Sequence, residues 1–410
     1  MKKLIAAILV LSLLFSFSAC SKKNENVNLM KDIEGNKSPV DKEAASGIYL
    51  TDFAAALLGQ CYEGENTLLS PLSVMCALAM VENGADGETK VQMEELFNGS
   101  CEDISSYLYH YCNTLPSGEK YSMSIANSIW IKNDESLTVN GDFLQKNADY
   151  FSADIYRSEF DKKAVKDINN WVSENTNEMI PEIVDSISPN AVMYLINALA
   201  FEAEWQDIYN EYAVREGDFT LESGKTKEVE FMYSGEGVYL EDENTTGFIK
   251  YYKDGKYAFV ALLPDEDEEI SDYVKALTGE KISDLLESST DCVVRTSIPK
   301  FETEYSKSLT EILGNMGMTD AFDPLSADFS ALGSYKNGNL YISDVMHKTY
   351  ISVAEKGTRA GAATSISVNA TGEPSIMEEP KEVYLDRPFV YMLIDCETET
   401  PFFIGVLTNP

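Results

Sequence analysis

Histidine is scarce in this chain, and the common sequence signatures of enzymes are missing. The 410 residues contain only two histidines, His110 and His347. There is no HExxH zinc motif, GxSxG nucleophile turn, glycine-rich phosphate loop or dinucleotide fingerprint. His110 lies in an acidic helix-like stretch, and His347 lies in an apolar strand-like run where a histidine is usually structural. The sequence therefore predicts a protein that is not an enzyme and uses no cofactor.

Positive charge is also scarce. The chain has 32 Lys and Arg against 68 Asp and Glu, which gives a formal net charge of −36 at pH 7. Such a surface repels phosphate groups, so nucleic acid is excluded as a natural partner. A cationic partner would be attracted instead, and that attraction should weaken as salt is added.

Paired cysteine motifs are missing as well. The seven cysteines form no CxxC pair and show no metal-ligand spacing, so the sequence predicts no metal site. Cys61 and Cys76 fall on apolar helical faces, where cysteine acts as a small hydrophobic residue. An exported chain permits disulfides, but these spacings specify none.

Residues 1–19 predict the signal peptide of a bacterial lipoprotein. Two lysines precede an apolar run over residues 4–17, which is too short for a comfortable transmembrane helix. The run ends in Phe-Ser-Ala-Cys at Cys20 and there resembles the lipobox of bacterial lipoproteins. The resemblance implies lipidation of Cys20 and a place on the extracellular face of a bacterial membrane, with lipid as the only membrane contact. The alternative is an ordinary secretory signal cut near Ala19, which would release the protein.

Two regions follow the signal. Residues 20–46 are polar and predict a flexible tether with a span of about 25–30 Å. Residues 47–410 contain no linker, repeat or low-complexity run, so they are expected to form one large domain.

Hydrophobic periodicity places helices mainly in the first half of the domain and strands in the second. Residues 48–61 have the helical period, and Ser70-Pro71 is a typical helix start. Residues 121–131 alternate as a strand does, and residues 191–201 are almost continuously apolar, as in a strand buried on both faces. Further strands are expected at residues 256–263, 293–301, 340–353, 388–394 and 402–407. This order favours an α+β fold with large, mostly antiparallel sheets.

The most informative segment reads Glu-Lys-Gly-Thr-Arg-Ala-Gly-Ala-Ala-Thr, from Glu355 to Thr364. It starts a stretch of about 25 residues without helical period, between two expected strands, and loops of that length are usually functional or disordered. Alternate residues from Thr358 onward are small or β-branched, and no proline occurs between residues 357 and 371. The pattern therefore predicts a loop that is able to become a strand. A flexible linker rich in Ala, Ser and Thr is the alternative.

Four segments of the chain resemble serpins. These are residues 66–97 (NTLLSPLSVMCALAMVENGADGETKVQMEELF), residues 168–205 with LINALAFEAEW, residues 344–364, and the carboxyl terminus from DRPFVYMLIDC onward. They occur in the family's order and extend the resemblance over residues 47–410. The resemblance implies the serpin architecture, with three β-sheets, eight to nine helices and an exposed reactive loop.

The resemblance also implies irreversible inhibition of a serine protease by a monomeric protein. The protease would cut the loop, form a covalent acyl-enzyme complex and be disabled as the upstream part of the loop enters the central sheet. The segment that enters first, called the hinge here, must be small and uncharged on its inward side. The hinge residues are Glu355, Gly357, Thr358, Ala360, Ala362, Ala363 and Thr364. A non-inhibitory serpin that acts as a binding or structural protein is the alternative.

The position of the bond that is cut depends on how residues are counted. The family's spacing from Glu355 points to Thr371–Gly372, and the distance back from the next strand points to Met377–Glu378. We favour Thr371–Gly372, because the trapping mechanism constrains the length that is inserted. The small residues before this bond suit a protease with a narrow apolar pocket, which favours an elastase-like target.

Three further assignments follow from the resemblance. The polar shutter beneath the central strands would consist of Ser70, Ser73, Asn197 and His347, and Trp205 would lie at the breach near the top of the sheet opening. Buried polar groups of this kind have to be hydrogen-bonded to be tolerated. Residues 101–110 contain no Lys or Arg, so no heparin site is expected.

Overall fold

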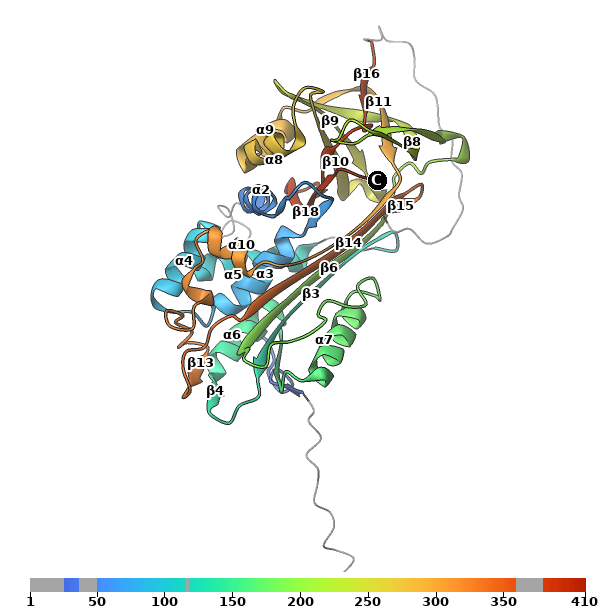
Figure 1. The fold of residues 1–410 in the computed structure, drawn as a ribbon. Coiled ribbons are helices and arrows are strands. Elements are labelled where there is room, and N and C mark those ends of the chain that lie inside the picture. The colour runs from blue at the N-terminus through green and yellow to red at the C-terminus, as the bar shows by residue number, and fades with distance from the viewer. Residues whose placement is uncertain (1–25, 37–49, 116–117, 359–378) are drawn as a thin grey trace, which may run out of the picture.

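A seven-stranded sheet forms the centre of the protein (Figure 1). The structure is a computed structural model that describes residues 26–36, 50–115, 118–358 and 379–410. Across the sheet, the strands are β1 (Val27–Asn28), β5 (Asp154–Ser158), β3 (Tyr121–Lys132), β6 (Met193–Glu204), β15 (Gly357–Thr358), β14 (Asp344–Ala354) and β12 (Phe301–Ser308). This sheet would have to open if the loop entered it.

The burial of the two central strands follows from their sequences. All but two of the β6 side chains are buried, which fits the apolar run read from the sequence. In β14, buried and half-buried side chains alternate along the whole strand, as expected when its two faces meet different surroundings. Both faces are covered, because α7 (Lys162–Asn175) lies against one face and the main hydrophobic core lies on the other (Figure 1).

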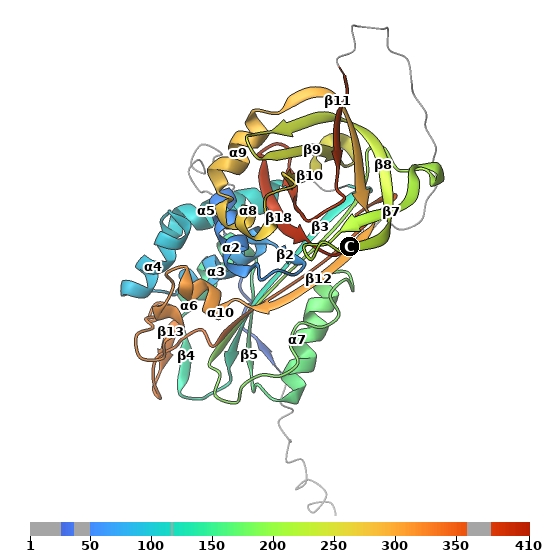
Figure 2. The same ribbon diagram turned by 45° about the horizontal axis from the view of Figure 1, so that its top comes forward.

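A second sheet lies beyond one end of the first (Figure 2). Its strands are β16 (Lys381–Tyr384), β11 (Thr290–Pro299), β8 (Thr226–Glu241), β9 (Thr245–Tyr251), β10 (Tyr257–Pro264), β17 (Phe389–Asp395), β18 (Thr400–Leu407) and β2 (Thr67–Leu69), with β7 (Val214–Thr220) paired to β8. Within it, β10, β17 and β18 are wholly buried. A small third sheet pairs β4 (Leu137–Val139) with β13 (Gly333–Tyr335).

The described residues contain nine α-helices. They are α2 (Leu50–Cys61), α3 (Pro71–Glu82), α4 (Gly87–Phe97), α5 (Cys101–Thr114), α6 (Gly141–Phe151), α7, α8 (Ile270–Ala276), α9 (Gly279–Glu287) and α10 (Thr310–Asn315). Short 3-10 turns occur at η2 (Glu211–Ala213), η3 (Lys253–Gly255) and η4 (Asp320–Phe322). Ser70 caps α3 and Pro71 opens it, as the sequence predicts. In these residues, no helix is long and apolar enough to cross a membrane. The α+β prediction is confirmed.

The expectation of a flexible tether over residues 20–46 is wrong for residues 26–36, because this segment packs on the domain. In β1, Val27 and Asn28 pair antiparallel with β5, and Met30 is 9% exposed. The Asn26 amide donates to Asp167 of α7 at 2.8 Å, and the backbone N–H of Asn36 donates to Asp149 of α6 at 2.8 Å. The polar composition of the segment did not indicate this docking, because the pairing with β5 uses backbone groups and only one side chain of the segment is buried. Cys20 lies outside the described residues.

Glu82, the last residue of α3, places a carboxyl group in the core. Its side chain is 1% exposed, and neither carboxyl oxygen has a hydrogen-bond partner in the described residues. Burial, followed by the nearby charge of Glu94, raises the pKa of Glu82 to about 8. Glu82 is therefore mostly protonated in the folded protein at neutral pH, whereas the unfolded chain ionises it near pH 4.5.

We predict that Glu82→Gln stabilises the protein by an amount that grows with pH. Between about pH 4.5 and 8 the folded state binds a proton at Glu82 that the unfolded state has lost, so wild-type stability falls as pH rises. The difference in the free energy of unfolding between Glu82→Gln and the wild type should increase by up to about 1.4 kcal/mol per pH unit in this window. Urea unfolding midpoints at pH 5 and pH 8 measure it. Glu88→Gln, at an exposed position of α4, is the control. The prediction would be contradicted if the variant and the wild type differed in stability by the same amount at both pH values.

Candidate functional site: the sheet opening and the hinge

The two central strands touch each other along only part of their length. β6 and β14 pair in parallel from Tyr194 and Asp344 to Leu199 and Thr349. Beyond that point β15 lies between them, with Thr358 paired to Ala203 of β6 on one side and to Val353 of β14 on the other. Both pairings are antiparallel, so the first two strand residues of the hinge already occupy the start of the opening.

Gly357 and Thr358 fit this position for different reasons. Gly357 has a φ of 150°, and a Cβ atom there would lie 1.9 Å from the carbonyl oxygen of Ala203, so only glycine is accommodated. Thr358 is 1% exposed, and its hydroxyl is hydrogen-bonded to the hydroxyl of Tyr252. Burial of the Tyr252 hydroxyl raises its pKa far above the usual range, so the tyrosine remains neutral. Two of the hinge residues predicted from the sequence are therefore buried strand residues.

The turn between β14 and β15 is fixed by hydrogen bonds to its backbone. Tyr209 and Trp205 donate their backbone N–H groups to the carbonyl oxygens of Glu355 and Lys356, each at 2.9 Å. The Glu355 carboxylate forms an ion pair with Lys300 at 2.9 Å, and Lys300 also contacts Glu230 at 2.9 Å. The Lys300 ammonium donates to both carboxylates, and these hydrogen bonds, to Glu355 first and then to Glu230, raise the pKa of Lys300. The chain is thus held in place up to the point where the loop leaves it.

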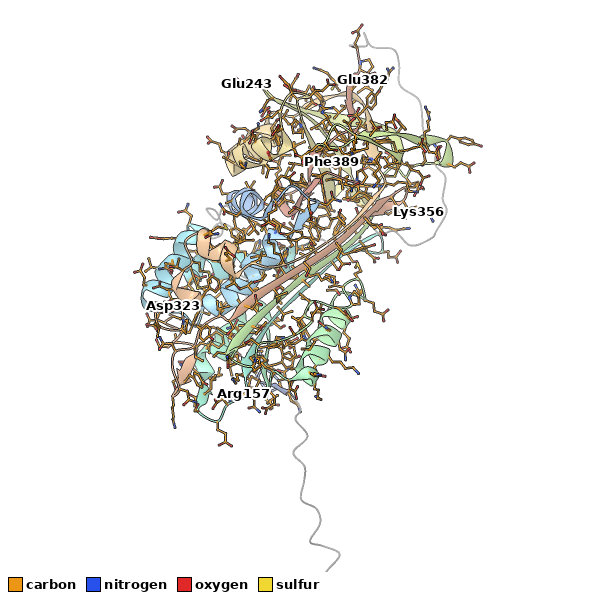
Figure 3. All side chains as sticks on the ribbon, viewed as in Figure 1. Arg157, Glu243, Asp323, Lys356, Glu382 and Phe389 are labelled. Atoms are coloured by element: carbon orange, nitrogen blue, oxygen red, sulfur yellow. The ribbon has the colours of Figure 1, made fainter. Side chains whose placement is uncertain are left out.

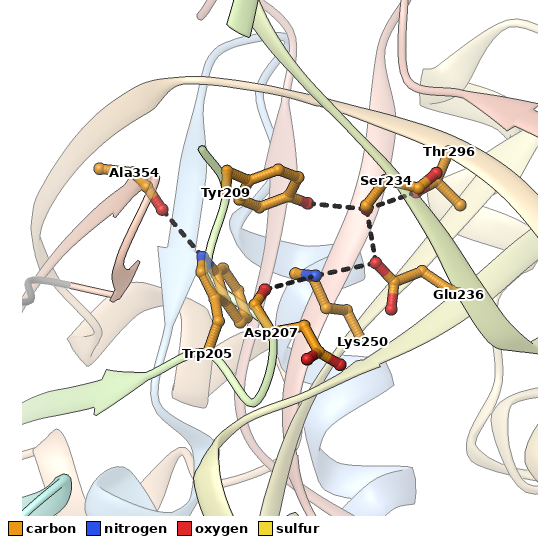
Figure 4. Close-up of polar contacts among 8 residues, drawn as sticks. All are labelled: Trp205, Asp207, Tyr209, Ser234, Glu236, Lys250, Thr296 and Ala354. Atoms are coloured by element: carbon orange, nitrogen blue, oxygen red, sulfur yellow. Dashed lines mark hydrogen bonds and ion pairs between the residues drawn. The ribbon is translucent and has the colours of Figure 1, made fainter. Parts of the chain in front are cut away.

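Trp205, predicted to lie at the breach, lies against this turn. Its indole N–H donates to the carbonyl oxygen of Ala354 at 2.8 Å, and its ring stacks on Tyr252 with centroids 4.3 Å apart. The ammonium of Lys250 lies 5.4 Å from the centroid of the Trp205 ring and 2.8 Å from a carboxylate oxygen of Glu236 (Figure 4).

The polar residues around Trp205 in Figure 4 were not predicted from the sequence. Glu236 accepts a hydrogen bond from Ser234, and the Lys250 ammonium also lies 4.5 Å from the ring centroid of Tyr209. A signal was available in the sequence, because Lys250 lies between Phe248-Ile249 and Tyr251-Tyr252. A charged residue that is almost fully buried is normally paired.

Three of the four residues assigned to the shutter form a connected network. The backbone N–H of Ser70 donates to Nε2 of His347 at 3.2 Å, so the ring proton is on Nδ1, which donates to the side-chain oxygen of Asn197. His347 of β14 and Asn197 of β6 are partners in the strand register, so this bond joins the two central strands. Ser73 takes part only through its backbone N–H, which donates to the Ser70 hydroxyl at 3.3 Å. The shutter role itself stays a prediction.

Asn127 completes the network and was missed in the sequence. The Asn197 amide donates to its side-chain oxygen at 2.9 Å, and the two residues face each other in the register of β3 and β6. The signal was a break in a pattern. Position 127 belongs to the alternating apolar set that contains Ile125 and Ile129, and a polar residue in such a set needs a partner.

The two histidines lie on different elements, His347 in β14 and His110 in α5. Both ring nitrogens of His347 are hydrogen-bonded, to an amide and to a backbone N–H, and burial lowers its pKa to about 3. His110 is half-buried. In the described parts of the chain, no group of three or more Asp, Glu, His or Cys side chains is placed to hold a metal ion.

The hinge residues Ala360, Ala362, Ala363 and Thr364 lie outside the described residues. So do both candidate bonds, Thr371–Gly372 and Met377–Glu378.

Comparison with known proteins identifies the family. The model of the family described as "Serpin (serine protease inhibitor)" matches residues 49–410, so the chain belongs to the serpins. The crystal structure of the thermophilic serpin tengpin in its native state superposes with a TM-score of 0.88 at 46% identity, covering 94% of this chain and all of that one. For tengpin in its latent state the TM-score is 0.78 at 44% identity, covering 92% of this chain and all of that one. The fold described here is thus more similar to the native state.

Curated sequences give the same family. The bovine leukocyte elastase inhibitor is 30% identical over 360 residues, which cover 84% of this chain and 93% of that protein. An uncharacterised serpin-like protein of Thermococcus kodakarensis is 29% identical over 384 residues, which cover 92% of this chain and 87% of that protein. The serpin fold, with nine helices in the described residues and three sheets, is therefore confirmed.

We predict that His347→Ala destabilises the protein and removes part of its acid sensitivity. The substitution leaves the Ser70 N–H and the Asn197 oxygen without their partner, at a cost of roughly 1–3 kcal/mol near neutral pH. In the wild type, the unfolded chain protonates His347 below about pH 6.5, whereas the folded state does so only near pH 3. Wild-type stability is therefore lost as pH falls through this window, by up to about 1.4 kcal/mol per pH unit.

Urea unfolding at pH 7, 5.5 and 4.5 tests this, with His110→Ala as the control. The His347 variant should have a flatter pH dependence than the wild type, and the His110 variant keeps the hydrogen bonds of His347 and so shows the effect of removing a histidine elsewhere. Gel filtration should also show more polymer for His347→Ala, because the contact between β6 and β14 is weakened. The shutter assignment would be wrong if His347→Ala stayed monomeric and as stable as the wild type.

Proposed function

We propose that this serpin is an irreversible suicide-substrate inhibitor of an elastase-like serine protease. The observation that carries the proposal is the position of β15 between β6 and β14. A strand that is antiparallel to both neighbours is extended by each residue that follows Thr358, provided that β6 and β14 separate. The loop therefore begins at the one place from which its insertion would extend an existing strand.

The chemistry of the reaction fits this geometry. The protease serine attacks a loop carbonyl, the amine of the next residue leaves, and an ester joins the protease to the upstream end of the loop. Release of the downstream end frees the upstream segment to enter the sheet. Each step of insertion replaces a contact between β6 and β14 with two ladders of backbone hydrogen bonds. The protease is carried along, and its catalytic geometry is distorted before water cleaves the ester.

The sequence of the loop supports rapid insertion. Residues 360, 362 and 363 are alanine, and the inward set that starts at Thr358 contains no charge and no proline. Insertion has to be faster than hydrolysis of the ester, so bulky or charged inward residues would favour escape of the protease. A non-inhibitory serpin is the alternative, and such a protein would not need an inward set of this kind.

The target class is inferred from the residues before the favoured bond. Val368, Asn369, Ala370 and Thr371 are small or β-branched, which suits a narrow apolar specificity pocket. The name of the bovine relative, leukocyte elastase inhibitor, agrees with this choice at 30% identity. The net charge of −36 should accelerate the encounter with a cationic protease at low salt.

The direct test mixes the purified protein with neutrophil and pancreatic elastase. We expect a covalent complex that survives a denaturing gel, together with a released carboxyl-terminal peptide. Mass spectrometry of that peptide identifies the bond, since it should begin at Gly372 and not at Glu378. Clean cleavage without any complex would favour the non-inhibitory alternative.

We predict that Thr358→Arg turns the inhibitor into a substrate. Thr358 is already 1% exposed, so the guanidinium would have to be buried both before and after cleavage. The expected result is cleaved loop, active protease and little complex on the gel. Thr358→Val is the control, because it is uncharged, has nearly the same shape and should still trap protease. The insertion mechanism would be refuted if the arginine variant formed as much complex as the wild type.

We also propose that lipid on Cys20 anchors the protein to the extracellular face of a bacterial membrane. With residues 26–36 docked on the domain, only residues 21–25 separate Cys20 from the docked segment. They reach at most about 18 Å when fully extended. This reach is shorter than the 25–30 Å expected for a tether that extends to residue 46.

Docking of the tether also sets the orientation of the anchored domain. Arg157, which pairs with Val27, lies at one end of the central sheet (Figure 3). Lys356 and Glu382 are near the two ends of the loop, and both lie toward the opposite end of the molecule (Figure 3). The side that carries the loop would therefore face away from the membrane, where a protease approaches.

We predict that Cys20→Ala moves the protein from the membrane fraction into the medium. A lipoprotein carries a diacyl glyceride, which binds firmly, whereas a chain without it has no membrane anchor. Cell fractionation and immunoblotting measure the distribution, and Ser21→Ala serves as the control. Equal amounts of wild type and Cys20→Ala in the medium would show that the chain is simply secreted.

A further inference from the structure

We propose that Cys76 and Cys112 are a site of disulfide formation that links α3 to α5. Their sulfur atoms lie 3.7 Å apart in the structure, although both thiols are free. A disulfide requires a distance of about 2.05 Å, so the sulfurs have to approach by about 1.7 Å. Side-chain rotation at both residues, with a small shift at the end of α5, has to supply this movement. The two residues are 36 positions apart, so nothing in their spacing marks them as partners.

This pair differs from the other cysteines of the described residues. Cys76 lies in the middle of α3, a helix whose side chains are all buried, so its backbone is held firmly. Cys112 lies in the last turn of α5, where a helix is most easily adjusted. Cys101, by contrast, directs its thiol to the side-chain oxygen of Asn83 at 3.6 Å, and Cys61 is buried beside Tyr305.

Solvent reaches the pair through a cavity. Both cysteines line a cavity of about 490 Å³ between α3, α5, α6 and β3, whose polar side includes Asn113, Asp154 and Trp171. Cys112 is partly exposed there, and Cys76 is 4% exposed. A small disulfide such as oxidised glutathione is therefore able to meet Cys112 first.

The reaction is a balanced thiol–disulfide exchange. The Cys112 thiolate attacks one sulfur of the small disulfide and expels a first thiolate, which leaves a mixed disulfide on Cys112. The Cys76 thiol then gives its proton to water, attacks Sγ of Cys112 and expels the second thiolate. Two protein thiols are oxidised to one disulfide, and the small disulfide is reduced to two thiols. The hydrogen bond to Cys112, together with burial, raises the pKa of Cys76, so Cys76 acts as the resolving residue.

The link would restrain a part of the molecule that supports the sheet opening. It closes a loop that contains α4 and most of α5, which limits the unfolded chain more than a short loop does. It also fixes α5 to α3, and α3 begins next to Ser70, whose N–H binds His347. The proposal does not depend on inhibitory activity, because it requires only the native fold and an oxidant.

Peptide mapping of the purified chain tests the proposal. The folded protein is incubated with oxidised glutathione, unfolded without reductant, alkylated and digested. We expect one cross-linked pair of peptides that contain Cys76 and Cys112, lighter than the reduced pair by two hydrogen atoms, with Cys61 and Cys101 alkylated. Alkylation of both residues, or glutathione retained on Cys112 without a link, would overturn the proposal.

A stability measurement gives a second readout. The oxidised protein should unfold at a higher urea concentration than the reduced protein, and dithiothreitol should abolish the difference. Cys112→Ser removes the link at the half-exposed position, so its urea midpoint should be the same with and without oxidant. Equal midpoints for oxidised and reduced wild type, despite a mapped link, would show that the bond places no restraint on unfolding and would overturn that part of the proposal.

Discussion

The parallel contact between β6 and β14 is the constraint on which the rest of this structure depends. It extends from Tyr194 to Leu199 on β6 and ends where β15 separates the strands. Side chains as well as backbone hold the two strands together, since the bond from His347 to Asn197 crosses the same boundary. The sheet is thus closed by a limited number of bonds and is already open at one end. A loop that enters there would replace the single interface between β6 and β14 with two strand interfaces. The form with the loop inserted would then be the more stable one, and the strain held in the present form would be released.

Buried charge around this opening positions groups more than it stabilises the fold. A buried ion pair such as Lys250–Glu236 gains little over apolar residues of similar size, whereas loss of one partner costs about 3–5 kcal/mol. Its effect is therefore to hold the Trp205 ring where the indole N–H meets the carbonyl oxygen of Ala354. Glu82 is the opposite case, because its carboxyl group has no partner in the described residues and remains protonated at neutral pH.

The elements that are strongly periodic could be predicted from the sequence, and those that depend on distant partners could not. The strands at residues 121–131 and 191–201 match β3 and β6 to within a few residues, because period and apolar content are local properties. The link between His347 and Asn197 was reached only through the serpin resemblance. Asn127, Lys250 and the docking of residues 26–36 were missed, because each is explained by a partner that is far away in the chain. The sequence indicated strand potential from Thr358 onward, but not that β15 already pairs with β6 and β14.

The docked amino-terminal segment contacts the end of the central sheet that lies away from the loop. It joins the edge strand β5, and it also reaches α7 through Asn26 and α6 through Asn36. α7 covers one face of the central sheet, so any separation of β6 and β14 has to be accommodated beneath a helix that this segment contacts. If Cys20 is lipidated, a pull on the anchor acts first on β1 and then on β5 and α7. The attachment point would then be mechanically part of the sheet that opens in the proposed insertion, at the end away from the loop.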